Sequence, residues 1–206
     1  LGQGEAAGAG VVGWGAGVKW TAGIIARHIA TQTLARRCVV LVDCCNWTGY
    51  ECDVLGVTND LRVIDIEVKI SRADFKADAA KDKWWHRLAW GEAGPKRHRL
   101  HPPRVWKHYV AMPLDVWRDD LMQFMPSPAS GLLLLTDKNG RVEVRCERRA
   151  TPSKTAERIS AASAIDIARL ANLRMWDAYA GHFAREQKAA SMTPNPHPQT
   201  ATLESA

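Results

Sequence analysis

The chain has 206 residues, of which 46% are apolar and 24% charged, and this composition excludes a fibrous or wholly disordered protein. Its formal net charge of +6 suits a polyanionic partner without identifying one. The five cysteines have neither the even count of a disulfide framework nor the paired spacing of a zinc site, so we interpret them as reduced thiols of a cytoplasmic protein. Because there is no run of about 20 apolar residues, we expect no membrane segment.

Composition divides the chain into three parts. Residues 1–19 are rich in Gly and Ala and are expected to form a flexible leader, and the polar residues 189–206 are expected to form a disordered tail. Residues 20–188 are expected to fold as a single domain.

The first half of this domain predicts a helix followed by strands. Apolar residues at helical spacing predict a helix over 21–37 with Thr21 as its N-cap, and the apolar run 38–43 predicts a strand. Two β-rich runs, 50–57 and 62–70, are separated by a four-residue turn and predict a hairpin.

The second half continues to alternate between helices and strands. A capping box that begins at Ser71 opens a predicted helix. The predicted elements are a helix over 71–88, a strand over 105–113, a helix over 114–125, two strands within 131–150 joined by Asn139-Gly140, and a long helix over 159–188 that packs on the domain. This order predicts an α/β fold with a mixed central β-sheet flanked by helices.

The second hairpin strand combines an apolar face with an ionic face, because side chains alternate along a strand. The ionic face carries Asp65, Glu67 and Lys69. A hairpin that turns about position 60 would add Asp53, opposite Glu67, and Glu51, opposite Lys69.

Directly opposed residues have Cβ atoms about 5 Å apart, and two carboxylates placed so close repel each other unless a cation or proton lies between them. A hard divalent ion such as Mg²⁺ takes oxygen ligands, and a lysine beside it completes the equipment for phosphodiester hydrolysis. The pattern therefore predicts a metal-dependent site, although a register slip of one residue would move Asp53 to the other face. A solvated strand with alternating charges is the alternative.

Asp53 followed by Glu67-Val68-Lys69 resembles the motif of the PD-(D/E)XK nuclease superfamily. The longer string ECDVLGVTNDLRVIDIEVKISRADFKAD and the later KDKWW are similar to the branch that contains MmcB-type DNA-repair proteins and related phage-encoded proteins. The similarity covers about 50–90 and is looser through 131–137. It implies a restriction-endonuclease-like core, with Asp53, Glu67 and the Val68 carbonyl as ligands of Mg²⁺ or Mn²⁺ and Lys69 as the catalytic lysine.

The sequence departs from the family pattern at two places. Cys52 occupies the position before Asp53, where proline is usual, and the segment 21–37 has no acid to match the glutamate that some relatives carry on the first helix. Glu51 is the candidate replacement ligand. A site with a single metal ion, or a weakened nuclease, would also account for the missing acid.

Basic residues after the hairpin are candidate contacts to the DNA backbone. The run 94–110 contains no acid, and such runs bind phosphates without reading base sequence, although a solvated basic surface is the alternative. We expect Trp84 and Trp85 in the core rather than stacked on bases. The candidate nucleic-acid contacts are Ser71, Lys76, Lys81, Lys96, Arg97, Arg99, Arg104 and Lys107.

The leading hypothesis is a divalent-metal-dependent DNA endonuclease that acts in DNA repair or phage nucleic-acid processing. The competing hypothesis is a catalytically weak or inactive protein of the same fold that serves as a DNA-binding repair accessory factor, and a structural phage or host-interaction protein is a distant third. The expected partner is DNA, and a homodimer is left open. The expected location is the bacterial cytoplasm, or the host cytoplasm for a phage-encoded protein.

Overall fold

The computed structural model describes residues 18–87 and 96–192. The predicted leader and tail therefore lie outside the described residues, except for 18–19 and for 189–192, which belong to a helix. Within the described ranges, no helix combines the length and the apolarity needed to cross a bilayer.

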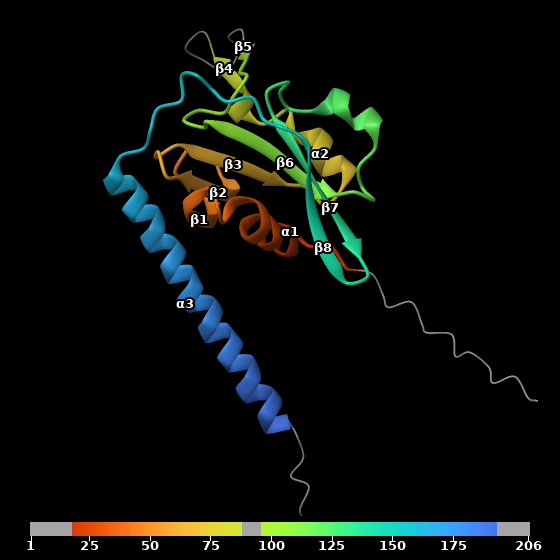
Figure 1. Cartoon of the computed structure of the whole chain (residues 1–206), viewed down its shortest axis with the longest axis vertical. Helices are drawn as coiled ribbons and strands as arrows, with labels where there is room; N and C mark the ends of the chain where they lie inside the picture. The colour runs from red at the N-terminus through yellow and green to blue at the C-terminus, as the bar shows by residue number, and fades with distance from the viewer. Residues whose placement is uncertain (1–17, 88–95, 193–206) are drawn as a thin grey trace, which may run out of the picture.

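A six-stranded mixed sheet forms the centre of the molecule, with strand order β1-β2-β3-β6-β7-β8 (Figure 1). Strands β1 to β3 form an antiparallel meander, β6 and β7 run parallel to β3, and β8 returns antiparallel to β7. The strands are β1 (Cys38–Cys45), β2 (Cys52–Thr58), β3 (Val63–Val68), β6 (Lys107–Pro113), β7 (Gly131–Lys138) and β8 (Arg141–Arg148). The prediction of an α/β fold with a mixed central sheet is confirmed.

Helices cover both faces of this sheet. Helix α1 (Ala22–Ile29) begins where Thr21 accepts the Ile24 N–H, and it continues as one π-helical turn, η1 (Ala30–Leu34). Ile25 and Ile29 of α1 pack against the even-numbered residues of β3. On the opposite face, Phe75 of α2 (Arg72–Asp78) packs against β6 and β7.

Two segments that were predicted as long helices are shorter. Helix α2 ends at Asp78 and is followed by a 3₁₀ turn, η2 (Asp82–Trp84), and by a small separate sheet of β4 (Trp85–Arg87) and β5 (Lys96–His98). The chain leaves the helix here because Lys83 and Trp84 turn inward, and both are buried. The predicted helix 114–125 is only a 3₁₀ segment, η3 (Asp119–Phe124), whose Leu121 is buried beside α2.

The long helix α3 (Ala161–Met192) packs on the domain only through its first turns. Ala164 and Ile167 are buried against β1 and β2, and Arg174 is paired with Asp43 at 3.0 Å. Further along, Trp176 is 61% exposed and Phe183 is 58% exposed, and the helix projects away from the sheet (Figure 1). The prediction that the whole helix packs on the domain is therefore wrong for its second half.

Candidate active site at the end of strand β3

The β2–β3 hairpin has the predicted register. Val54 pairs with Ile66, and the pairing continues to Val57 with Val63, so the hairpin turns about position 60. The hydroxyl of Thr58 donates to Asp60 at 2.6 Å and fixes the turn between the strands. The pairing recorded between β2 and β3 begins at Val54, so Asp53 lies one residue beyond it.

The register of the hairpin places Asp53 beside Glu67, but the Asp53 carboxylate turns to the backbone of Val68. The Val68 N–H donates to Asp53 Oδ2 at 2.7 Å. The alternation of side chains is interrupted here, because Cys44 has φ of 45° and both Cys45 and Cys52 join the core cluster of Leu55. Burial raises the pKa of Asp53, the Val68 hydrogen bond opposes this, and the charge of Glu67 adds to it.

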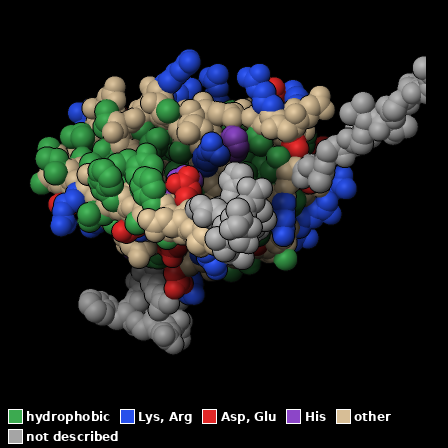
Figure 2. Space-filling view, turned by 90° about the horizontal axis from the view of Figure 1, so that it is seen from below, with side chains coloured by type: hydrophobic (Ala, Val, Ile, Leu, Met, Phe, Trp, Pro, Cys, Tyr) green, Lys and Arg blue, Asp and Glu red, His purple; other side chains and the backbone are tan. Residues whose placement is uncertain are grey.

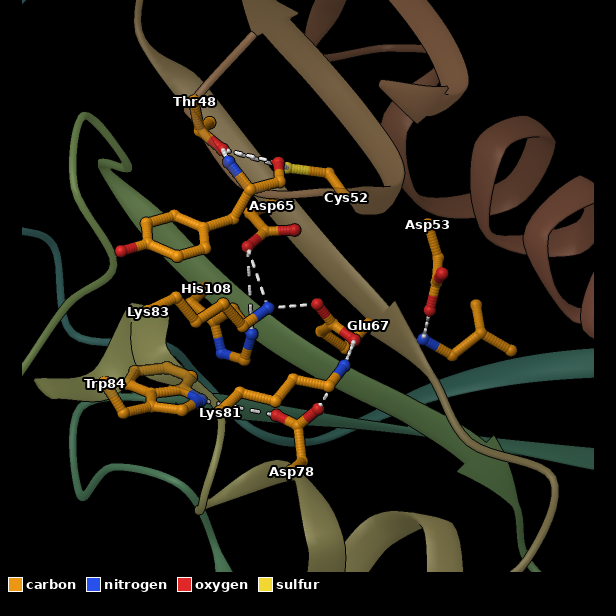
Figure 3. A network of polar contacts seen from close by, with 12 residues as sticks. Thr48, Cys52, Asp53, Asp65, Glu67, Asp78, Lys81, Lys83, Trp84 and His108 are labelled. Carbon is orange, nitrogen blue, oxygen red and sulfur yellow. Dashed lines mark hydrogen bonds and ion pairs between the residues drawn. The ribbon is translucent and has the colours of Figure 1, made fainter. Parts of the chain in front are cut away.

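Glu67 is buried and is surrounded by lysines. Its Oε1 contacts Lys83 Nζ, and its Oε2 lies 2.9 Å from Lys81 Nζ (Figure 3). The same Oε2 lies 3.3 Å from Lys69 Nζ. In Figure 3 the Glu67 carboxylate points toward Lys81 and Lys83, while the Asp53 carboxylate lies apart from them. Since Glu67 and Lys69 are each only 2% exposed, the alternative of a solvated charged strand is wrong.

Asp78 and Asp65 complete this ionic cluster, which we define as Asp65, Glu67, Asp78, Lys69, Lys81 and Lys83. Asp78 Oδ1 lies 2.8 Å from the ammonium groups of both Lys69 and Lys81, and Asp65 lies 3.6 Å from Lys83. Each carboxylate therefore has a lysine partner, and the carboxylates and lysines of the cluster match in number.

The acidic members of the cluster differ in their pKa values. Burial raises the pKa of Asp65 to about 6, against the pull of Lys83. Burial would also raise the pKa of Asp78, but Lys69 and Lys83 outweigh it and hold that pKa well below its usual range. The carboxylates in turn raise the pKa of Lys81 above its usual value, in spite of its partial burial.

His108 and Trp84 close the cluster on the side of β6. The His108 ring packs edge-on to Trp84 at 4.8 Å between centroids, and its Nδ1 lies 2.9 Å from the Ser130 hydroxyl. Its Nε2 lies 3.9 Å from Asp65 and has no hydrogen-bond partner among the described residues. Burial lowers the pKa of His108 well below its usual value, so the ring is neutral at pH 7.

The sequence interpretation missed the roles of Asp78, Lys83 and His108. Asp78 and Lys83 both fall within the predicted helix 71–88, whose residues were not expected to face β3. The signal that could have found His108 was strand alternation, since it pairs with Asp65 in the β3–β6 ladder and so shares its face. Asp65, which the alternation places on the ionic face of the strand, is 1% exposed.

The remaining predicted site residues lie in different places. Glu51 is exposed, and Lys69 pairs with Asp74 and the cluster acids instead of with Glu51. Ser71 is occupied as the N-cap of α2, accepting the Asp74 N–H.

The predicted DNA contacts are divided between surfaces. Lys76 lies over the Phe124 ring at 4.5 Å, and Lys81 belongs to the ionic cluster. Lys96 and Arg97 are exposed on β5, next to Arg99, whose guanidinium contacts His86 at 3.1 Å. Arg104 is exposed near Trp47, whereas Lys107 lies on the opposite face of the sheet from the cluster.

The donor atoms near Asp53 and Glu67 suit a hard divalent cation in type but are not gathered into a ready site. In the part of the chain that the structure describes, no group of three or more acidic, His or Cys side chains is arranged to hold a metal ion. One oxygen of Asp53 accepts no hydrogen bond from a described residue, so it is free to act as a ligand. Both Glu67 oxygens contact lysines, so metal binding there requires the partly exposed Lys81 to release Oε2.

Comparisons with known proteins add a structural likeness without a function. No protein-family model matches the chain, and no curated protein does. A solved structure of a protein of unknown function from Silicibacter pomeroyi is similar to this chain at 22% identity, covering 89% of this chain and 99% of that chain with a TM-score of 0.43. That level of likeness transfers no functional residue.

Proposed function

We propose that this chain is a divalent-metal-dependent endonuclease that hydrolyses DNA phosphodiester bonds, in DNA repair or in phage nucleic-acid processing. The observation that carries the proposal is the meeting of Asp53 with the Glu67-Val68-Lys69 segment. The Asp53 carboxylate accepts the N–H of the residue that lies between Glu67 and Lys69. Residues 15 positions apart are thus held together at the end of the paired hairpin.

The order of elements also supports a restriction-endonuclease-like core. Helix α1 is followed by the meander β1-β2-β3, by α2, and by β6 parallel to β3. This is the arrangement of helix, hairpin strands, helix and strand that the sequence resemblance implies. It places the end of β3, where Glu67 and Lys69 lie, between β2 and β6.

In the proposed site, Asp53, Glu67 and the Val68 carbonyl would hold Mg²⁺ or Mn²⁺. The bound ion would supply charge neutralisation at the phosphate and a water of lowered pKa. Lys69 is fixed by Asp78 at 2.8 Å, so its ammonium group stays beside Glu67 and can donate to a phosphate or water oxygen. Lys81 is about half exposed and can exchange Glu67 for a substrate phosphate.

A second candidate function is a DNA-binding accessory protein of weak or absent activity. The specific observation in its favour is that lysines contact both oxygens of Glu67, in a cluster whose charges already match. In this case the exposed basic residues would still bind the DNA backbone, and the cluster would serve stability.

Plasmid nicking by the purified full chain separates the two candidates. With Mg²⁺ or Mn²⁺, the wild type should convert supercoiled DNA to open circles, and Asp53→Asn, Glu67→Gln and Lys69→Met should each reduce the rate by about 100-fold or more. Asp166→Asn, an exposed acid on α3, is the matched control and should cut as the wild type does. Equal rates for all variants would show a contaminating nuclease, and DNA binding without cutting would favour the accessory function.

The salt dependence of DNA affinity tests the predicted contacts. Each phosphate that a protein neutralises adds about 0.9 to the slope of log affinity against log salt concentration for duplex DNA. Arg97→Gln and Arg104→Gln should therefore each reduce the slope by about 0.9 if the arginine neutralises one phosphate. Lys107→Gln, on the opposite face of the sheet, should leave the slope unchanged, and the reverse result would place DNA on that face.

A further inference from the structure

A cavity of about 600 Å³ lies on the α1 side of the sheet, away from the ionic cluster. Its apolar lining includes Ile64, Ile66, Tyr109 and Leu133, which belong to three neighbouring strands. Its volume is in the range of small-molecule sites, which enclose about 300–1,000 Å³.

Basic side chains gather around this apolar floor. The cavity is lined by Arg36 and Arg37 from the end of the α1 segment, by Lys107 at the start of β6, and by Arg149 just after β8. Across residues 18–87 and 96–192, none of these four forms an ion pair with a described residue. The one acid in the lining, Asp60, is instead paired with Arg62 at 3.0 Å.

The absence of a paired acid affects the pKa of Lys107. Its Nζ lies 4.4 Å from the centroid of the Trp106 ring. Burial lowers its pKa, and repulsion from Arg37 and Arg149 lowers it further. The four basic side chains therefore line one cavity with no acid among the described residues paired to them, in contrast to the lysines of the ionic cluster.

Strand alternation separates this cavity from the candidate active site. Ile64 and Lys107 are partners in the β3–β6 ladder and line the cavity, whereas the next pair, Asp65 and His108, lies at the ionic cluster on the other face. Glu67 and Lys69 lie toward the opposite end of β3 from Ile64. A ligand in the cavity would thus not touch the proposed nuclease residues.

We propose that this cavity binds a small organic phosphate with a flat apolar body, a ligand class that is independent of the proposed nuclease function. One guanidinium group can donate two parallel hydrogen bonds to two oxygens of a phosphate. Several cations around one cavity favour a dianion over a monoanion. The apolar body lies against Ile66, Leu133 and the Tyr109 ring, where its burial adds affinity. A cavity of this volume admits one such molecule and not a DNA duplex.

Isothermal titration calorimetry of the full chain with 1-naphthyl phosphate tests the proposal. We expect this probe to bind at least tenfold more tightly than inorganic phosphate, which lacks the apolar body, and than 1-naphthol, which lacks the charge. The corresponding carboxylate, 1-naphthoate, should bind more weakly than 1-naphthyl phosphate. No binding of the phosphate at millimolar concentration, or equal binding of 1-naphthol or 1-naphthoate, would overturn the assignment.

Substitutions locate the binding to the cavity. Arg149→Gln and Lys107→Gln should each weaken 1-naphthyl phosphate binding by about tenfold, since a hydrogen bond to a charged group is removed. Arg145→Gln, an exposed β8 residue paired with Glu147 and outside the cavity lining, is the matched control and should bind as the wild type does. Thermal unfolding of each variant confirms that it is folded. Unchanged binding by a folded Arg149→Gln variant would place the probe elsewhere and refute the proposal.

Discussion

Two groups of basic side chains lie over opposite faces of strands β3 and β6. Carboxylates of the chain pair with the first group, whereas no acid among the described residues pairs with the second. On the α2 face, Lys69 and Lys83 are buried against carboxylates of the same chain. On the α1 face, Arg37, Lys107 and Arg149 line a cavity without pairing to an acid among the described residues. Lys107 and His108 are neighbours in the chain but belong to different faces.

The lysines of the ionic cluster are neutralised within the protein, whereas the basic residues of the cavity are available to bind a ligand. A buried ammonium group without a partner is costly, so the lysines of the ionic cluster are held by Glu67, Asp65 and Asp78. The basic side chains that line the cavity remain partly exposed to water and need no partner within the chain, so their electric field acts on anions from solution. The surface of the molecule likewise shows Lys and Arg in several separate places (Figure 2). The net charge of +6 alone does not show which of these basic residues are paired and which are not.

The largest expected effect is the removal of a lysine from the ionic cluster. Lys83→Met should lower the free energy of unfolding by about 3–5 kcal/mol, because the buried Glu67 and Asp65 lose their shared cation. Urea denaturation measures the change, and Lys138→Met, which removes an exposed pair with Glu143, should leave stability nearly unchanged. Equal effects of the two substitutions would contradict the buried pairing.

The next effect concerns the floor of the cavity. Tyr109 lies directly over Gly131, and a Cβ there would collide with the Tyr109 ring and with the backbone of Ala150. Gly131→Ala should therefore destabilise the fold by about 1–3 kcal/mol and weaken 1-naphthyl phosphate binding by displacing the ring. Gly181→Ala, in an open position on α3, should instead be neutral or stabilising. Chemical denaturation and calorimetry on both variants check this pair of expectations.

A smaller, pH-dependent effect belongs to His108. Because its pKa is lowered in the folded state, the denatured chain binds a proton below pH 6.5 that the folded chain does not. The His108 contribution therefore makes stability fall as the pH drops below 6.5, with a slope of up to about 1.4 kcal/mol per pH unit. His108→Gln should remove this slope in denaturation series between about pH 5 and 7. The partly exposed His28→Gln is the control, and a slope that survives in His108→Gln would assign the effect to another group.

The smallest effect has the opposite sign. Lys107→Met removes a charge that Arg37 and Arg149 repel, so at low ionic strength it should raise stability by no more than a few tenths of a kcal/mol. Added salt should abolish the gain, because it screens the repulsion in the wild type. A clear decrease of stability at low salt would mean that Lys107 has a stabilising acidic partner, and it would remove the contrast with Lys83.

Local sequence rules were sufficient for much of the framework. The caps at Thr21 and Ser71 are where their side chains predict them, and Asn139 and Gly140 both have the positive φ of a tight hairpin turn. The turn at Thr58–Asp60 fixed the β2–β3 register, and alternation then divided β3 into two faces. These features depend on residues close together in the chain, so the sequence by itself determined them.

Long-range packing decided the rest. Whether the ionic face of β3 is solvated or buried depended on Asp78, the last residue of α2, and on Lys83 and Trp84, which follow because α2 ends early. The direction of the Asp53 carboxylate depended on the Val68 N–H, which donates a hydrogen bond to it. The sequence thus specified a strand with Glu67 and Lys69 on one side. Only the tertiary structure decided which segments cover each side, because that choice is made by contacts between residues far apart in the chain.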